Sequence, residues 1–551
     1  MMDNYWTRKA TSRRRLLKGG AVTATAFAVT GLLGAGCGDD DDDSTSGGGA
    51  TTQPGSGSPA ASPTTSGPKV GGELSYAGAE PVDGNPLTST LGGEHEYHWQ
   101  LHDNLIAYDQ KAQLDASRSL AEKWEIKSPT EIVLTLRQGV KFANGETLTA
   151  EDVKYNIDLV LDPATKSAAR GDLSPIESVT TPDAKTVNLK LKAPSASLLT
   201  LLGDRGGMIV SKKALETGMK EYSTKPNGGS GPFRLDNWTP KERWAVSRNP
   251  EYWRKAGSTQ LPYLQKLTSR FITDPAVAQA ALQNGEIQLM PISSTDKAKF
   301  KDFAFAEFNG AAAVTTWLDS TIAPTSDVRV RQALAYAYDR KSLSEVLTGG
   351  VEAPAIGIIT PAQWAFDSSV QAPNFDVKKA KELLAAAGIA KGTKVKAFSL
   401  GIEAAKRRAE LVQGFLKAID IDMEITLGDA SQLVPTLMAH THHMIFASMS
   451  MRADPHGILG LTIRKGGALT AGLPSAPDVD DLIDKANQTY DQAERKKLYT
   501  TMQDLINNKY CMHVWETYSV GLIAASKKVG GLDTVFGGEG KPRFAELSLQ
   551  A

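Results

Sequence analysis

Strand-like and helix-like hydrophobic periodicities alternate along nearly the whole chain after residue 68, and this alternation limits the fold more than any other feature. Every second residue is apolar in 132–136 and 187–191, as expected of half-buried strands. Apolar residues recur with helical spacing in several longer stretches. These stretches are 276–284, 330–337, 378–387, 404–419 and 493–507. Interleaved helices and strands predict an α/β protein with mixed sheets.

Length and charge exclude several other classes of protein. The chain has 551 residues, too many for one ordinary hydrophobic core, so two or three lobes are expected. Its 61 Lys and Arg residues balance 62 Asp and Glu residues, and this near-neutrality argues against a nucleic-acid partner. The two cysteines, Cys37 and Cys511, cannot form a disulfide framework.

Residues 1–37 have the pattern of an export signal. Basic residues dominate 1–20, and an uncharged run from 19 to 38 follows. Segment 12–18, with three arginines before two leucines, resembles the twin-arginine export motif; a generic signal with clustered positive charge is the alternative. Segment 33–37 resembles a bacterial lipobox, so we expect lipidation of Cys37. The alternative is ordinary cleavage that leaves a reactive free cysteine.

Residues 38–68 are predicted to form a flexible tether. They contain five consecutive aspartates and then Ser, Thr, Gly, Pro and Ala. Such a segment cannot bury enough apolar surface to fold. Together with a lipid on Cys37, the tether predicts an exported protein anchored to the outer face of the cytoplasmic membrane, in the periplasm or at the cell surface.

Several motifs in the body occur in the order known from one family. They are Gly-Gly-Glu-Leu at 71–74, Leu-Ala-Glu-Lys-Trp-Glu at 120–125, the segments 136–146 and 148–153, Ser-Gly-Pro-Phe at 230–233, Arg-Asn-Pro-Glu-Tyr-Trp at 248–253, and the segments 327–334, 339–340 and 380–388. On these motifs the chain resembles the extracellular solute-binding proteins of ABC importers, in the peptide/nickel-binding family, family 5. The resemblance covers nearly all of the body.

The resemblance implies a two-lobed periplasmic-binding-protein-like fold of type II, in its large three-domain variant. Domain I would comprise 69–103, 226–310 and 513–551, with domain II inserted at 104–225 and domain III at 311–512. The lobes would close on a solute, an oligopeptide or a peptide-like compound, and a membrane permease would receive it. The implied protein is a monomer without a cofactor or catalytic activity. A ligand-sensing module for a membrane receptor, which has the same fold, is the alternative.

The loop 448–455 bears on the ligand. In peptide-binding members of the family, an aspartate three residues before an Asp-Pro step pairs with the peptide's ammonium group. Here the step is Asp454-Pro455, but that earlier position holds Met451, which offers no charge. Either Asp454 takes over this role, or the ligand is not a free-amine peptide. Arg452 could bind a carboxylate or phosphate, or it could face solvent.

Aromatic residues near the expected domain crossings are further candidates for ligand contact. Flat rings there would suit stacking on sugars or gripping apolar peptide side chains, so an oligosaccharide is an alternative ligand; packing in the core is the alternative role. These candidates are Trp99, Trp317 and Trp515, with Glu94, Tyr97, Asp319 and Tyr518 as neighbours.

Two groups of histidines raise a nickel chelate as another alternative ligand. His95, His98 and His102 would share one face of a helix. The second group contains His440, His442 and His443, with His456 further along. Imidazoles suit nickel, copper or zinc, but neither group has the spacing or the fixed carboxylate of a zinc-protease helix. We therefore predict no metal site.

No segment carries a recognised catalytic motif. The chain lacks a Gly-x-Ser-x-Gly elbow, a Walker loop and a metalloprotease helix. Cys511 stands beside an apolar run and is expected to be a buried small side chain rather than a nucleophile. The sequence therefore predicts a binding protein rather than an enzyme.

Overall fold

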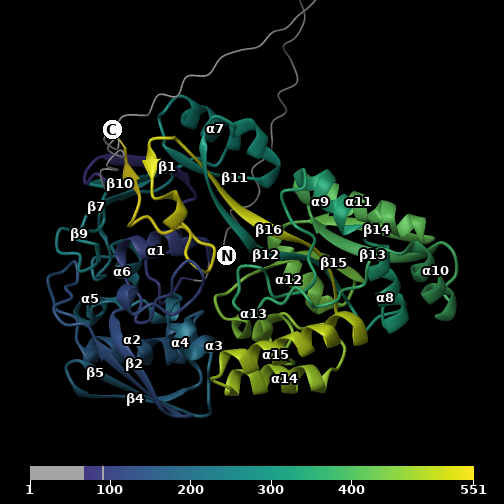
Figure 1. Cartoon of the computed structure of the whole chain (residues 1–551), viewed down its shortest axis with the longest axis horizontal. Coiled ribbons are helices and arrows are strands. Elements are labelled where there is room, and N and C mark those ends of the chain that lie inside the picture. Colours follow the sequence, from purple (N-terminus) through teal and green to yellow (C-terminus); the bar gives the residue numbers. More distant parts are fainter. Residues whose placement is uncertain (1–67, 90–91, 551) are drawn as a thin grey trace, which may run out of the picture. The chain divides into compact units, whose positions relative to one another are not determined.

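The computed structural model describes residues 68–89 and 92–550, drawn in colour in Figure 1. These residues belong to one compact unit that runs from Ser66 to Ala551. The predicted export signal, the lipidation at Cys37 and nearly all of the predicted tether lie outside the described residues. Within the described ranges, no helix combines the length and the apolar composition that a membrane span requires.

Ten strands form one mixed sheet in the order β14-β13-β15-β12-β16-β11-β1-β10-β7-β6. Their bounds are β1 Glu73–Gly78, β6 Phe233–Thr239, β7 Arg243–Arg248, β10 Lys266–Phe271, β11 Leu289–Ile292, β12 Ala304–Leu318, β13 Thr393–Leu400, β14 Ile421–Gly428, β15 Met444–Ser450 and β16 His513–Ala525. β1 is parallel to β10 and β11, and β13 is parallel to β14 and β15. The long antiparallel pair β12 and β16 joins the two halves of the sheet (Figure 1).

Helices accompany this sheet. They are α1 His95–Leu101, α7 Pro275–Gln283, α8 Val328–Ala337, α9 Arg340–Thr348, α10 Val377–Ala386, α11 Glu403–Ala418, α12 Ala430–Ala439, α13 Pro455–Thr462, α14 Pro477–Gln488 and α15 Gln492–Asp504. Their starts follow local signals: Asp274 accepts hydrogen bonds from the N–H groups of Ala276 and Val277, and Pro275 occupies the first turn of α7. The helical periodicities read from the sequence are therefore confirmed, with ends that shift by a few residues.

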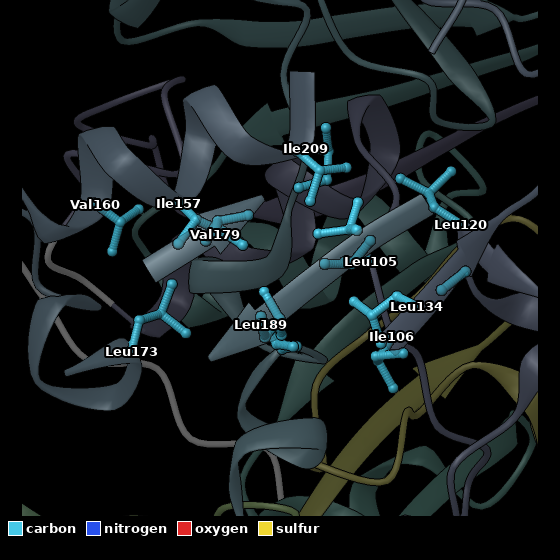
Figure 2. Packing of buried hydrophobic residues seen from close by; sticks show 14 of the residues in the cluster. Leu105, Ile106, Leu120, Leu134, Ile157, Val160, Leu173, Val179, Leu189 and Ile209 are labelled. Carbon is cyan, nitrogen blue, oxygen red and sulfur yellow. The ribbon is translucent and has the colours of Figure 1, made fainter. Parts of the chain in front are cut away.

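A second, antiparallel sheet has the order β2-β3-β5-β4. Its strands are β2 Ala121–Ser128, β3 Glu131–Leu136, β4 Ile176–Asp183 and β5 Thr186–Leu191, and the helices around it are α2 Ala150–Leu161, α3 Arg170–Leu173, α4 Leu198–Leu201, α5 Lys212–Glu216 and α6 Met219–Thr224. The predicted strands 132–136 and 187–191 pair with each other, as Leu134 lies opposite Val187. Figure 2 shows Leu134 and Leu189 in one cluster with Ile157 of α2.

The remaining strands are short pairs, β8 Lys255–Ala256 with β9 Thr259–Gln260, and β17 Val529–Gly530 with β18 Ser548–Leu549. The predicted fold class, α/β with mixed sheets, is confirmed. All four strands of the second sheet and α2–α6 fall within residues 121–224. The proposed boundaries of three domains stay a prediction.

A candidate ligand-binding cavity

A cavity of about 520 Å³ lies between parts of the chain that are far apart in sequence. One wall comes from β12, β13, α11, α12, β15, the loop that follows β15, α13 and the residues just after α13; the facing wall comes from α1, α3, residues 204–205 and residues 539–541. The first wall is mainly apolar. Its apolar side chains are those of Trp317, Leu400, Leu433, Phe446, Met449, Met451, Ile458, Leu461 and Leu469. A cavity of this size can enclose a small ligand and bury its apolar groups.

The facing wall carries charged groups of both signs. Its acids are Asp172, Asp204 and Glu539, and its bases are Arg205 and Lys541, with His95 beside them. His95 Nε2 contacts Asp204 Oδ1. Burial would raise the pKa of Asp204, but the charges of His95, Arg452 and Arg205 outweigh burial and hold that pKa well below its usual value. Asp204 is therefore an anion at neutral pH.

Sequence reasoning missed a buried ion pair at the edge of this cavity. Arg408 of α11 lines the cavity, and its Nε and Nη2 donate to Glu516 of β16 at 2.6 and 2.7 Å. Arg408 also donates to the carbonyl oxygens of Thr315 and Ala447, so its guanidinium joins three strands. A signal was present in the sequence, because Arg408 precedes the buried Val412 by one helical turn and therefore lies on the apolar face of α11.

Three of the predicted ligand-contact residues, Trp317, Met451 and Arg452, line the cavity. Trp317 Nε1 is buried and has no hydrogen-bond partner among residues 68–89 and 92–550. Met451 is buried, and its Sδ accepts from the Thr360 hydroxyl at 3.9 Å. Arg452 does not point freely into solvent, because its Nη1 lies 3.0 and 3.1 Å from the two carboxylate oxygens of Asp172.

Asp454 does not line the cavity. It caps α13 by accepting from the His456 N–H at 2.9 Å, and its Oδ1 accepts from Arg495 Nη2 at 2.8 Å. The side chains of Asp454 and Arg495 are only 1% and 6% exposed. The hypothesis that Asp454 shifts into the amine-binding role therefore receives no support, since its carboxylate already neutralises a buried guanidinium.

The three candidates near α1 have partners within the fold and do not line the cavity. Glu94 accepts from the N–H groups of Val82 and Asp83 at 2.5 and 3.0 Å. Tyr97 donates its hydroxyl to the Ala79 carbonyl oxygen at 2.5 Å. Trp99 donates Nε1–H to Asn104 at 2.7 Å, and the Arg543 guanidinium lies 4.1 Å from the centre of its ring. These groups hold loops in place, as buried polar groups must find partners.

The candidates Asp319, Trp515 and Tyr518 are likewise absent from the cavity wall. Asp319 accepts from the Thr321 N–H at 2.8 Å and lies 2.7 Å from His440 Nδ1. Trp515 donates to Asn507 at 2.6 Å. Tyr518 donates to the Gly357 carbonyl oxygen at 3.2 Å. Asp319 follows the end of β12, and Trp515 and Tyr518 belong to β16; all three side chains are buried.

His95, His98 and His102 share one face of α1 and its end, and their adjacent ring centres are 6.4 Å apart. Other bonds occupy the ring of His102. The Gly228 N–H donates to the Tyr222 hydroxyl, Tyr222 donates to His102 Nε2, and His102 Nδ1 donates to the His98 carbonyl oxygen. Burial lowers the pKa of His102 to about 4, so the ring is neutral.

The second histidine group is dispersed. His440 ends α12 in a left-handed conformation, and His443 Nδ1 accepts from the Lys396 N–H at 2.8 Å. His442 contacts Thr441, and His456 lies in the first turn of α13. Within residues 68–89 and 92–550, no three His, Cys, Asp or Glu side chains are grouped so that they could hold a metal ion.

Replacing His513 with phenylalanine is expected to stabilise the protein, and more strongly in acid. Both ring nitrogens of His513 are buried without partners among the described residues, between Trp317 and Trp515. Burial lowers the pKa of His513 to about 3. Between pH 6.5 and 3 the unfolded chain therefore takes up a proton that the folded chain does not, and stability falls as the pH falls.

His513→Phe should raise the free energy of unfolding by about 1 kcal/mol at pH 7, and by about 2 kcal/mol more at pH 5. Urea unfolding at the two pH values measures both differences. His442→Phe, at a partly exposed ring, is the matched control and should change little. An equal effect of His513→Phe at both pH values would contradict this reasoning.

Comparisons with known proteins agree on one family. A model of bacterial extracellular solute-binding proteins, family 5, matches residues 116–468. A putative ABC transporter peptide-binding protein of Brucella abortus is 32% identical over 317 residues, which cover 55% of this chain and 57% of that protein. The glutathione-binding protein GsiB of Escherichia coli O157:H7 is 27% identical over 443 residues, 78% of this chain and 84% of that protein.

Among solved structures, the ABC transporter substrate-binding protein CtaP of Listeria monocytogenes has a similar fold. It superposes with a TM-score of 0.79 at 22% identity, covering 88% of this chain and all of that one. At this identity the likeness concerns the fold alone. The chain spans little more than half the length of the Brucella relative.

Proposed function

Because the chain belongs to the bacterial extracellular solute-binding proteins, family 5, we propose that it is the solute-binding component of an ABC importer. The family model covers more than half of the chain, so the resemblance inferred from the motifs is confirmed. The proposed protein captures a solute outside the cell by closure around the 520 Å³ cavity and delivers it to a membrane permease.

We propose that the solute is an oligopeptide or a peptide-like compound. The observation that carries this proposal is the cavity itself, with an apolar wall and a facing wall of both charge signs. A peptide presents apolar side chains, a carboxylate and, unless it is blocked, an ammonium group, and each has a counterpart there. Met451 is uncharged, and Asp454 pairs with Arg495 and does not line the cavity, so the ammonium would have to face Asp172, Asp204 or Glu539. The names of the relatives agree with this ligand class.

The remaining parts of the proposal concern location and chemistry. The protein would be exported, anchored through a lipid on Cys37 to the outer face of the cytoplasmic membrane, and monomeric. It would perform no chemistry on its ligand. The single body cysteine, Cys511, supports this last point, because burial raises the pKa of its thiol to about 12 and keeps it protonated.

A thermal-shift screen of the purified protein in metal-free buffer tests the ligand class. A ligand that binds only the folded state raises the melting temperature. The panel contains di- to pentapeptides, their N-acetylated forms, oligosaccharides, and nickel with and without histidine. Stabilisation by peptides supports the proposal, and the acetylated forms report whether an acid of the cavity holds the amine. Stabilisation by sugars alone, or by the nickel chelate alone, would contradict a peptide ligand and indicate an oligosaccharide or a nickel chelate in its place.

Trp317→Phe should weaken ligand binding about fivefold. The Trp317 ring lines the cavity, and phenylalanine removes part of the apolar surface that a bound ligand would cover, which costs about 1 kcal/mol of binding energy. Trp238→Phe is the matched control, because it makes the same substitution in β6, and Trp238 does not line the cavity. Equal affinities of the two variants, by calorimetry, would remove Trp317 from the site.

A further inference from the structure

A second cavity, of about 470 Å³, adjoins the proposed ligand cavity. The two share four lining residues, Ala168, Asp172, Arg452 and Leu461. The second cavity is markedly more polar than the first. Its polar lining includes Ser174, Ser197, His456, Arg464, Asp484 and Asn487. The boundary between the two cavities therefore contains an ion pair, Arg452 with Asp172.

The Arg452–Asp172 pair joins parts of the chain that are 280 residues apart. Asp172 belongs to α3, beside the four-stranded sheet, and Arg452 follows β15. Their side chains are 23% and 32% exposed, so the pair is neither fully buried nor a loose surface contact. Burial would lower the pKa of Arg452, but Asp172 and Asp204 outweigh it and keep the guanidinium charged.

The fold holds Arg452 across this boundary. Gln363 Nε2 donates to the Arg452 carbonyl oxygen at 2.8 Å, which fixes the backbone. The stem of the side chain lies against Gly457 of α13, where an added Cβ atom would come within 2.7 Å of Arg452 Cδ. A glycine within a helix costs stability relative to alanine, and here Gly457, in the first turn of α13, makes room for the arginine stem. Asp454, which caps α13, and its partner Arg495 keep that helix in place.

We infer that the Arg452–Asp172 pair is a length gate, which closes the ligand cavity against the second, polar cavity and thereby determines how long a bound peptide can be. This inference rests on the proposed function. A di- or tripeptide fits the first cavity with the pair intact. A longer peptide must break the Arg452–Asp172 ion pair to place its end among the polar groups of the second cavity. The energy needed to break the pair weakens the binding of the longer peptide.

Calorimetric affinities for a series from tripeptide to pentapeptide test the gate. In the unaltered protein the pentapeptide should bind at least about tenfold more weakly than the tripeptide of the same composition. The double variant Arg452→Ala/Asp172→Ala removes both charges at once, so that neither is left unpaired. In this variant the preference for the tripeptide should fall about tenfold, whatever happens to the absolute affinities.

Gly457→Ala provides a second, independent variant. It retains both charges and favours the helix, but it displaces the Arg452 stem, so it should also reduce the length preference. Tyr490→Phe is the matched control. The Tyr490 hydroxyl donates to the Pro129 carbonyl oxygen at 3.1 Å and joins the same two parts of the chain without lining either cavity. The length preference should survive in this variant.

Each outcome is decisive. Equal binding of tripeptide and pentapeptide by the unaltered protein would overturn the gate and leave the proposed function standing. An unchanged length preference in both gate variants would do the same. If no peptide binds to any form of the protein, the proposed function itself fails, and the gate fails with it.

Discussion

Replacing Arg408 with methionine is expected to lower the free energy of unfolding by about 3–5 kcal/mol. The side chain of Glu516 is only 2% exposed, and that of Arg408 is 13% exposed. Methionine preserves the apolar stem of Arg408 but leaves the Glu516 carboxylate, within the described part of the chain, with one side-chain donor, the Thr316 hydroxyl at 2.7 Å. Removing the cation that neutralises a buried carboxylate is among the most destabilising changes that a substitution can make.

Urea unfolding measures this loss, and Arg329→Met is the matched control. Arg329 and Asp327 are as close as Arg408 and Glu516, at 2.6 Å, but they are 47% and 30% exposed. The control should lose far less stability, because water screens both of its exposed charges. The double variant Arg408→Met/Glu516→Gln should recover part of the stability, because it removes the unpaired charge. If Arg408→Met and Arg329→Met lowered the free energy of unfolding equally, burial would not determine how much each ion pair contributes to stability.

Replacing Asp454 with asparagine should lower the free energy of unfolding by about 3 kcal/mol without changing how the protein distinguishes free-amine from N-acetylated peptides. Asparagine still caps α13, but it no longer neutralises Arg495, whose guanidinium also lies 5.0 Å from the centre of the Trp364 ring. The ratio of the two peptide affinities measures any role in amine binding, and urea unfolding measures the structural role.

Asp376→Asn is the matched control for Asp454→Asn. Asp376 caps α10 by accepting from the Lys379 N–H at 2.9 Å, and among the described residues it forms no ion pair with a buried cation. Its replacement should cost well under about 1 kcal/mol, because asparagine is an equally good cap. If Asp454→Asn is as stable as this control but loses its preference for free-amine peptides, Asp454 binds the ligand, and the cavity described here is incomplete.

The candidate site shows where sequence reasoning reaches its limit. Met451 and Arg452 were found because they belong to a loop with a recognisable Asp-Pro step, and Trp317 because it lies near an expected crossing. Asp204 and Glu539 carried no comparable signal. They meet at the cavity only because residues separated by more than 300 positions fold together. Conversely, Trp515 and Tyr518 looked equally suitable in sequence, and only the structure gives them Asn507 and Gly357 as partners.

Most helices and strands could be predicted because their signals are local. The period of the apolar residues in 132–136 and 404–419 reports the side that faces a core, and a cap such as Asp274 lies next to the helix it starts. The family could also be predicted from the sequence, because its motifs are short, local and arranged in a fixed order along the chain.

The tertiary structure alone decided the order of the strands and the composition of the cavity. β12 pairs with β16, about 200 residues further along the chain, and no local sequence pattern predicts this pairing. Whether a charged side chain can bind a ligand depends on whether the folded chain already places an opposite charge from a distant segment beside it. Asp454 and Glu516 have buried arginines beside them, whereas Asp172 and Arg452 meet at the boundary of two cavities. That difference arises from packing, and it separates the residues that hold the fold from those that can meet a solute.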